Sequence, residues 1–379
     1  MNAATKPICV GMLLLGSFVA ASGLDAQETK DQTPRIQVAI LLDTSGSMQG
    51  LINQARDQLW KVVNEFATAK RGGKTPELQV ALYQYGSGSI PSSKGFLRMV
   101  LPLTTDLDKV SEELFALKVG GSREYCGRVI KAATVALSWS GSNDDLKTIF
   151  IAGNEPFTQG DVDYRAACKA AIAKGITVNT IHCGPRQVGV DTKWEHGATL
   201  ADGKYMHIDQ NRKVVHISAP QDKELAQLGA ELNKTYLPYG PRGKSSAANQ
   251  TAQDANASRV SPGNSAQRAV AKASAHYRNS SWDLVDGVRE GKIKLEDVKT
   301  EDLPEEMQRQ SLAERKTYVA ANQKKRAGLQ KKIKELNEQR KKHVEAEMKK
   351  RSESGGKTLD AVIVSTVREQ AAEKGIEFK

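Results

Sequence analysis

The segment from residue 36 to residue 42 reads Ile-Gln-Val-Ala-Ile-Leu-Leu and is almost continuously apolar. A run of this kind is typical of a β-strand that is covered on both faces, as in a parallel sheet. The next segment, 48–69, repeats apolar residues at helical spacing. A buried strand followed by an amphipathic helix predicts an α/β fold rather than an all-helical or all-β one.

The same alternation of strands and helices continues to about residue 239. We predict further strands at 78–85, 97–103, 148–152, 176–182 and 204–208, and helices at 106–117, 125–137, 162–173 and 221–236. Strands that are separated by helices indicate a doubly wound, mostly parallel sheet. We therefore predict one α/β domain over residues 34–240.

The first 26 residues have the pattern of a signal peptide. Lys6 precedes an apolar stretch over residues 8–21, which ends in small residues suited to cleavage. An uncleaved membrane anchor is the alternative, and the shortness of the stretch favours cleavage. We expect an exported protein, either periplasmic or secreted.

The composition changes beyond the α/β domain. Segment 241–267 is rich in Ser, Ala, Asn, Gln and Gly, which predicts a flexible linker. Segment 268–303 is expected to be a short amphipathic segment around Trp282, and 304–379 a charged helical tail.

Most of the net charge of +11 lies in this tail. Residues 311–351 contain 14 Lys and Arg against 5 Asp and Glu. The apolar positions fit only a broken coiled-coil heptad, so the helix is expected to be solvated or weakly paired. Its charge suits an anionic envelope surface, whereas no nucleic-acid-binding motif is present and no nucleic-acid partner is expected.

The most informative motif directly follows the first strand. Segment 43–47 reads Asp-Thr-Ser-Gly-Ser and opens the first helix. Ligands of open α/β sheets bind at this edge, and a carboxylate with two hydroxyls suits Mg²⁺ or another divalent cation such as Ca²⁺ or Mn²⁺. Helix capping is the alternative, but it explains one such residue better than three.

Segment 43–48 (Asp-Thr-Ser-Gly-Ser-Met) resembles the signature of the von Willebrand factor type A family, with its metal-ion-dependent adhesion site. The resemblance covers about residues 34–239 and implies the doubly wound fold predicted above. It also implies that Ser45 and Ser47 bind the ion directly, while Asp43 acts largely through water.

The resemblance places two more loops at the site. In the second, Ser122 follows a glycine pair where the family usually has threonine, and Glu124 is the second candidate ligand. In the third, Gly153 stands where the family has aspartate. Either Asn154 or Glu155 supplies an oxygen to the same space, or the site binds its ion weakly.

These observations predict a protein-binding module, for adhesion or complex assembly, with no catalytic residues. It would capture an acidic side chain of a protein partner at the divalent cation. One alternative is a metal-free scaffold whose basic tail mediates assembly or envelope attachment. Another is an enzyme that uses Cys126 and His182 as nucleophile and base.

Three cysteines remain after export, namely Cys126, Cys168 and Cys183. Both Cys126 and Cys183 are predicted at the carboxyl edge of the sheet, so they are the candidate disulfide. Cys168 is predicted within a helix that faces the sheet.

Overall fold

The computed structural model describes residues 33–211, 216–350 and 358–378, and the chain from residue 33 onward forms one compact unit. The predicted signal peptide, 1–26, lies outside the described residues. Within them, no helix combines the length and the apolar character that a membrane span requires.

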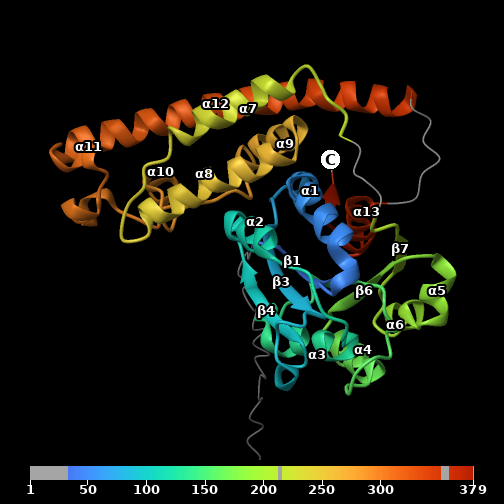
Figure 1. The fold of residues 1–379 in the computed structure, drawn as a ribbon. Helices are drawn as coiled ribbons and strands as arrows, with labels where there is room; N and C mark the ends of the chain where they lie inside the picture. Colours follow the sequence, from blue (N-terminus) through green and yellow to red (C-terminus); the bar gives the residue numbers. More distant parts are fainter. Residues whose placement is uncertain (1–32, 212–215, 351–357, 379) are drawn as a thin grey trace, which may run out of the picture. The chain divides into compact units, whose positions relative to one another are not determined.

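The centre of this unit is a six-stranded sheet in the order β4-β3-β1-β5-β6-β7 (Figure 1). Its strands are β1 Arg35–Asp43, β3 Glu77–Tyr85, β4 Leu97–Thr104, β5 Leu146–Gly153, β6 Thr177–Cys183 and β7 Tyr205–Ile208. Only β4 is antiparallel to its neighbour. The prediction of a doubly wound, mostly parallel sheet is confirmed.

Helices cover both faces of the sheet. One face carries α1 Gln49–Phe66, α2 Leu107–Ala116 and α13 Leu359–Ala372, and the other carries α3 Cys126–Ala136, α4 Tyr164–Ile172 and α6 Trp194–Thr199, with α5 Arg186–Asp191 beside α6. Strand β1 shows why its sequence is apolar throughout. Val38 packs in the core beneath α1, α2 and α13, whereas Leu41 packs in the core beneath α3, α4 and α6. Both are almost fully buried.

The last helix of this sheet layer comes from the end of the chain. The sequence predicts that helix 221–236 completes the α/β domain, but α7 (Asp222–Asn233) packs mainly against other helices. Helix α13 lies beside α1 instead (Figure 1), and the two-residue strand β8 (Glu377–Phe378) pairs with β2 (Ala69–Lys70). The α/β layer is therefore incomplete at residue 240.

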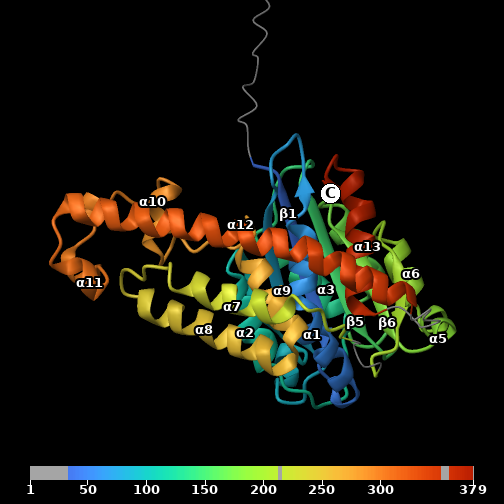
Figure 2. The same ribbon diagram turned by 90° about the horizontal axis from the view of Figure 1, so that it is seen from above.

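The remaining helices form a second layer over α1 and α2 (Figure 2). They are α7, α8 Gly243–Val260, α9 Pro262–Lys272, α10 Leu284–Arg289, α11 Glu305–Gln308 and α12 Leu312–Lys350. Short 3-10 turns lie at η1 Gly46–Met48, η2 Ser92–Lys94, η3 Leu295–Asp297 and η4 Thr300–Asp302. We call the layer formed by α7 to α12 the helical layer.

The predicted flexible linker over 241–267 is wrong, because α8 and most of α9 occupy this segment. Its small residues allow close helix packing, with Ala257 and Ala266 fully buried. Its amides are also used: Gln253 Oε1 accepts a hydrogen bond of 2.8 Å from the hydroxyl of Ser111 on α2. A composition typical of linkers here forms a tightly packed helix pair.

The basic tail is also docked. Helix α12 buries Arg326 and Arg340, two residues that break its apolar repeat. Arg326 pairs with Asp283 at 2.7 Å, and Arg340 pairs with Asp222 at 2.6 Å. These arginines attach α12 to the rest of the helical layer, so the face predicted to be solvated packs within this chain.

The short amphipathic segment predicted at 268–303 docks through its aromatic residue. Trp282 is 5% exposed and stacks on Tyr236 with 5.7 Å between the ring centroids. The following Leu284 and Val285 are fully buried in a small cluster beneath α12. This segment therefore holds the start of α10 against the end of α7.

Candidate metal site

The first loop of the candidate site begins where β1 ends. Strand β1 lies between β3 and β5, the point from which strand order runs outward in both directions. Asp43 is fully buried, and its Oδ1 accepts a hydrogen bond of 2.7 Å from the backbone N–H of Ser45. The hydroxyls of Ser45 and Ser47 are 3.3 Å apart, and Ser47 is exposed to solvent. The three predicted oxygen donors of this loop thus lie together.

Backbone hydrogen bonds attach the second loop to the first. The N–H of Gly46 donates to the carbonyl of Gly121 at 3.1 Å, and the N–H of Gly120 donates to the carbonyl of Thr44 at 2.8 Å. A Cβ on Gly121 would lie 2.2 Å from the backbone nitrogen of Gly88, so only glycine allows this approach.

The two candidate ligands in the second loop differ in burial and in contacts. Ser122 is exposed and makes no hydrogen bond to any described residue. Glu124 is 2% exposed, and its Cγ lies 3.0 Å from the point where a Cβ on Gly86 would stand. Asp43 Oδ1 lies 2.7 Å from that same point. The structure therefore brings Glu124 to Asp43, whereas Ser122 makes no hydrogen bond to Asp43 or to any other described residue.

The third loop contributes from the end of β5. The hydroxyl of Ser47 donates to Asn154 Oδ1 at 3.5 Å, so Asn154 lies at the outer side of the serine pair. Glu155 is half-buried, and its backbone carbonyl accepts a hydrogen bond of 2.8 Å from Trp194 Nε1. Asn154 therefore contacts the first loop, and Glu155 lies close enough for its charge to raise the pKa of Asp43.

Burial without a countercharge dominates the electrostatics of the site. Together, burial and the negative charges of Glu124 and Glu155 raise the pKa of Asp43 to about 7, with burial as the largest cause and the hydrogen bond from Ser45 opposing it. Burial likewise raises the pKa of Glu124, with Glu155 as the next cause. Among the described residues, Asp43 Oδ2 and Glu124 Oε2 are buried without a hydrogen-bond partner. Unpaired buried carboxylate oxygens are costly, and a bound cation would relieve this cost.

The residues present fit a hard divalent cation. The donors are hydroxyl, amide and carboxylate oxygens, which Mg²⁺ and Ca²⁺ prefer. Within the described ranges, no three His, Cys, Asp or Glu side chains are grouped to hold a metal ion. The serine hydroxyls would therefore have to complete any such site, as the motif predicts.

Sequence reasoning missed two residues that shape this site, Tyr85 and Gly86. The hydroxyl of Tyr85 donates to the carbonyl of Ala152 at 2.9 Å, beneath the loops. Gly86 has φ +79° and leaves the space that Glu124 occupies. The only available signal was a glycine directly after a strand, which often marks a close approach.

The predicted disulfide between Cys126 and Cys183 is wrong, since both are free and buried, as is Cys168. Cys126 packs in the cluster on one face of the sheet and Cys183 in the cluster on the other. The two thiols reach the carboxyl edge from opposite faces.

The Cys126–His182 pair also lacks the features of a nucleophile and its base. Burial raises the pKa of Cys126 well above its usual range and lowers the pKa of His182 to about 4. Both groups are therefore neutral near pH 7, and the ring of His182 packs against Trp194 with 5.7 Å between centroids. A reactive cysteine requires the opposite shift, toward the thiolate.

Comparisons with known proteins agree with the fold. The family model described as von Willebrand factor type A domain matches residues 37–202. No curated protein sequence matches the chain.

Three similar solved structures illustrate the range of proteins found. BatB from Bacteroides thetaiotaomicron is 18% identical with a TM-score of 0.36, over 46% of this chain and 90% of that one. The SpRpn10 VWA domain is 16% identical with a TM-score of 0.35, over 48% of this chain and 100% of that one. Proximal thread matrix protein 1 from the mussel byssus, with a zinc-occupied MIDAS motif, is 9% identical with a TM-score of 0.37, over 48% and 43% of the two chains.

Proposed function

Because residues 37–202 form a von Willebrand factor type A domain, we propose that this protein is an exported binding module. It captures an acidic side chain of a protein partner at a divalent cation, Mg²⁺ before Ca²⁺ or Mn²⁺. The observation that supports this most is the pair of buried, unpaired carboxylate oxygens of Asp43 and Glu124 beside the two serine hydroxyls.

Each part of the first loop has a role in this proposal. The N–H of Ser45 holds Oδ1 of Asp43, while the second oxygen, Oδ2, lies beside Gly153 with no hydrogen-bond partner among the described residues. The hydroxyls of Ser45 and Ser47 offer two neutral donors, of which Ser47 reaches the surface. When bound, a divalent cation leaves a coordination position that a carboxylate can fill. The exposed position of Ser47, beside the half-buried Asn154, gives a partner access to this point.

The experiment has two stages. Mg²⁺ and Mn²⁺ are titrated into the full chain by calorimetry, and envelope proteins are then captured with Mg²⁺ or with EDTA. Asp43→Ala and Ser45→Ala are expected to lose both the heat of cation binding and the EDTA-sensitive capture. Ser122→Ala is the matched control, because its hydroxyl is exposed and makes no hydrogen bond to any described residue. A wild-type chain that binds neither cation at millimolar concentration contradicts the proposal.

A second candidate function rests on the division of charge along α12. Its buried basic residues are the arginines Arg326 and Arg340, each paired with a carboxylate. The rest of the helix carries ten exposed lysines and only four exposed glutamates. The surplus of lysines suits attachment to an anionic envelope surface.

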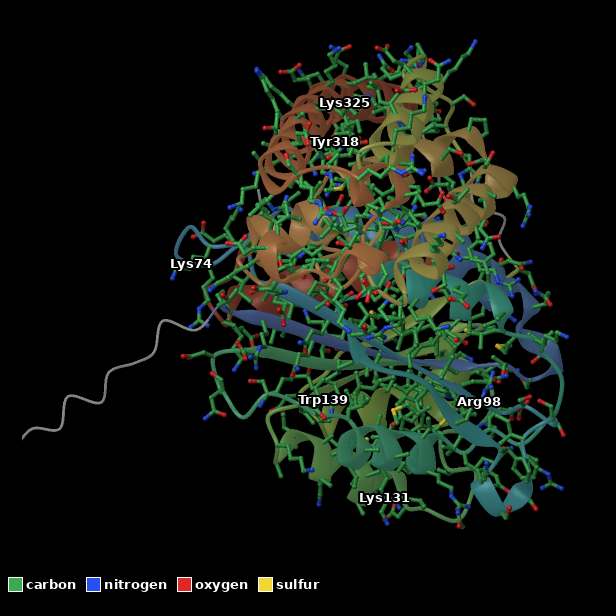
Figure 3. The ribbon with its side chains drawn as sticks, turned by 90° about the vertical axis from the view of Figure 1, so that its left-hand side faces the viewer. Lys74, Arg98, Lys131, Trp139, Tyr318 and Lys325 are labelled. Carbon is green, nitrogen blue, oxygen red and sulfur yellow. The ribbon has the colours of Figure 1, made fainter. Side chains whose placement is uncertain are left out.

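Vesicle sedimentation tests this candidate with the full chain and vesicles rich in phosphatidylglycerol. The test variant replaces lysines of α12 that make no salt bridge to a described residue, namely Lys324, Lys325, Lys332 and Lys342, with glutamine. The control variant replaces exposed lysines of the sheet layer, namely Lys94, Lys131, Lys169 and Lys193. Figure 3 shows Lys325 on the helical layer, far from Lys131 on α3.

Only the α12 variant is expected to lose sedimentation, and wild-type binding should fall between 0.05 M and 0.5 M salt, because exposed charges are screened. An equal loss of sedimentation in both variants would show that binding depends only on the net charge of the chain, and would contradict a specific role of α12.

A further inference from the structure

The end of β5 has no room for the carboxylate that the family places there. A Cβ on Gly153 would lie 2.5 Å from the hydroxyl oxygen of Tyr85 and 3.1 Å from Asp43 Oδ2. Tyr85 is fully buried, and its hydroxyl is held by the carbonyl of Ala152. An aspartate at residue 153 would therefore collide with Tyr85 before its own carboxylate reached the site.

The side chain of Glu124 lies instead on the side of the other carboxylate oxygen of Asp43, Oδ1. Glu124 passes through the space left by Gly86, where a Cβ would meet Asp43 Oδ1 at 2.7 Å and Glu124 Cγ at 3.0 Å. Gly86 also adopts φ +79°, a conformation that side chains other than glycine rarely adopt. The backbone N–H of Glu124 donates to Gln159 Oε1 at 2.5 Å, and Arg123 forms a β-bridge with Gly86. The second loop is thus fixed in the position that delivers this side chain.

We propose that Glu124 is the second carboxylate ligand of the cation site and takes the role of a side chain at residue 153, whose space Tyr85 fills. This inference rests on the proposed cation site and specifies its donors. Its basis is that Glu124 Oε2 is buried with no hydrogen-bond partner among the described residues. With Asp43, it gives the site two negative charges, which balance a divalent cation.

Calorimetric titration of Mn²⁺ into the full chain tests this assignment. Glu124→Gln keeps the shape of the side chain and removes its charge, and we expect the dissociation constant to rise at least tenfold. Ser122→Ala, in the same loop, should change it less than twofold. Melting of each variant in EDTA checks the fold, and a cation-induced rise in melting temperature gives a second measure of binding.

A rescue experiment separates a ligand from a merely structural residue. Gly153→Asp alone should not strengthen Mn²⁺ binding, because Tyr85 blocks it. Tyr85→Phe removes the obstructing oxygen. The triple variant Glu124→Gln/Gly153→Asp/Tyr85→Phe should therefore recover at least half of the affinity lost in Glu124→Gln, measured as the logarithm of the dissociation constant. A structural role of Glu124 would give no such recovery.

The possible failures are distinguishable. If Glu124→Gln binds Mn²⁺ as the wild type does while Asp43→Ala does not, the assignment of Glu124 is overturned and the proposed function stands. If the triple variant is folded but binds Mn²⁺ as weakly as Glu124→Gln, the proposal that Glu124 takes the role of a side chain at residue 153 is also overturned. If the wild-type chain binds no cation, both the proposed function and this inference fail.

Discussion

The two layers of this molecule differ in the countercharges that they supply to their buried carboxylates. At the edge of the sheet, Asp43 and Glu124 are buried, and each keeps an oxygen without a partner among the described residues. In the helical layer, Asp254 is contacted by Arg268 at 2.8 Å and by Lys272 at 2.6 Å. Asp254 is half-buried, which raises its pKa, but the charges of Arg268 and Lys272 outweigh this and hold the pKa below its usual range.

This difference indicates what each cluster is for. In the helical layer, the chain supplies its own countercharges, and the ion pairs join helices: Arg326 links α12 to Asp283, and Arg340 links it to Asp222. At the sheet edge, the chain supplies carboxylates, hydroxyls and an amide but no cationic side chain among the described contacts. A missing countercharge at an accessible loop edge points to a ligand, whereas a complete ion pair points to architecture.

The contrast requires an intact sheet layer, which α13 completes from the end of the chain, and a truncation tests this with the largest expected effect. Ending the chain at residue 350 removes α13 with its buried side chains, among them Leu359, Val362 and Val367. Each is worth about 1.5–3 kcal/mol, so the loss is comparable to the whole stability of a domain, about 5–15 kcal/mol. We expect loss of cooperative thermal unfolding by circular dichroism. A truncated chain that melts cooperatively at the wild-type temperature would show that α13 is dispensable.

Arg326→Met tests whether the ion pairs of the helical layer are structural. It leaves Asp283 and Asp286 buried without the guanidinium that contacts them at 2.7 and 3.0 Å. Breaking a buried pair from one side costs about 3–5 kcal/mol of unfolding free energy, which urea denaturation measures. Lys325→Met is the matched control on the exposed side of α12 and should stay within about 0.5 kcal/mol of the wild type. Equal effects of the two variants would contradict a structural role.

In contrast to Arg326→Met, Asp43→Asn should not lower the stability of the cation-free protein. Its oxygen can still accept from the N–H of Ser45, and the substitution removes a buried charge that no side chain neutralises. In EDTA we expect the free energy of unfolding to stay within about 1 kcal/mol of the wild type or to rise. The rise in melting temperature that Mg²⁺ gives the wild type should disappear. A loss as large as that of Arg326→Met would remove the contrast between the layers.

The sequence was a good guide where the signal was local. The apolar run of β1 and the Asp-Thr-Ser-Gly-Ser motif together span 12 consecutive residues, 36–47, so strand, edge and loop could be placed together. The six strands of the sheet and helices α1 to α4 follow from such patterns, whereas α5 and α6 were not predicted. The positions of Ser45 and Ser47 beside Asp43 follow from the turn itself.

Contacts between distant segments could not be predicted in the same way. Ala257 and Ala266 carry no periodic apolar signal, since their packing depends on the close approach of two helices. Arg326 interrupts a heptad, and its partner Asp283 is 43 residues away. Glu124 could not be preferred to Ser122 from the sequence, because the space that admits it is created by Gly86, which directly follows β3.

Glu155→Gln offers the smallest and finest test of the contrast. Glu155 is half-buried, and its charge raises the pKa of both Asp43 and Glu124, yet it has no buried unpaired oxygen among the described residues. Removing it should raise the free energy of unfolding in EDTA by about 0.5 kcal/mol, because a partly exposed like charge acts weakly. The dissociation constant for Mn²⁺ should rise less than threefold, well below the effect of Glu124→Gln. Glu373→Gln changes an exposed glutamate that directly follows α13 and is the control for net charge. A tenfold rise in the dissociation constant for Glu155→Gln would indicate that Glu155 binds the cation directly. The half-buried Glu155 would then belong with the buried donors Asp43 and Glu124.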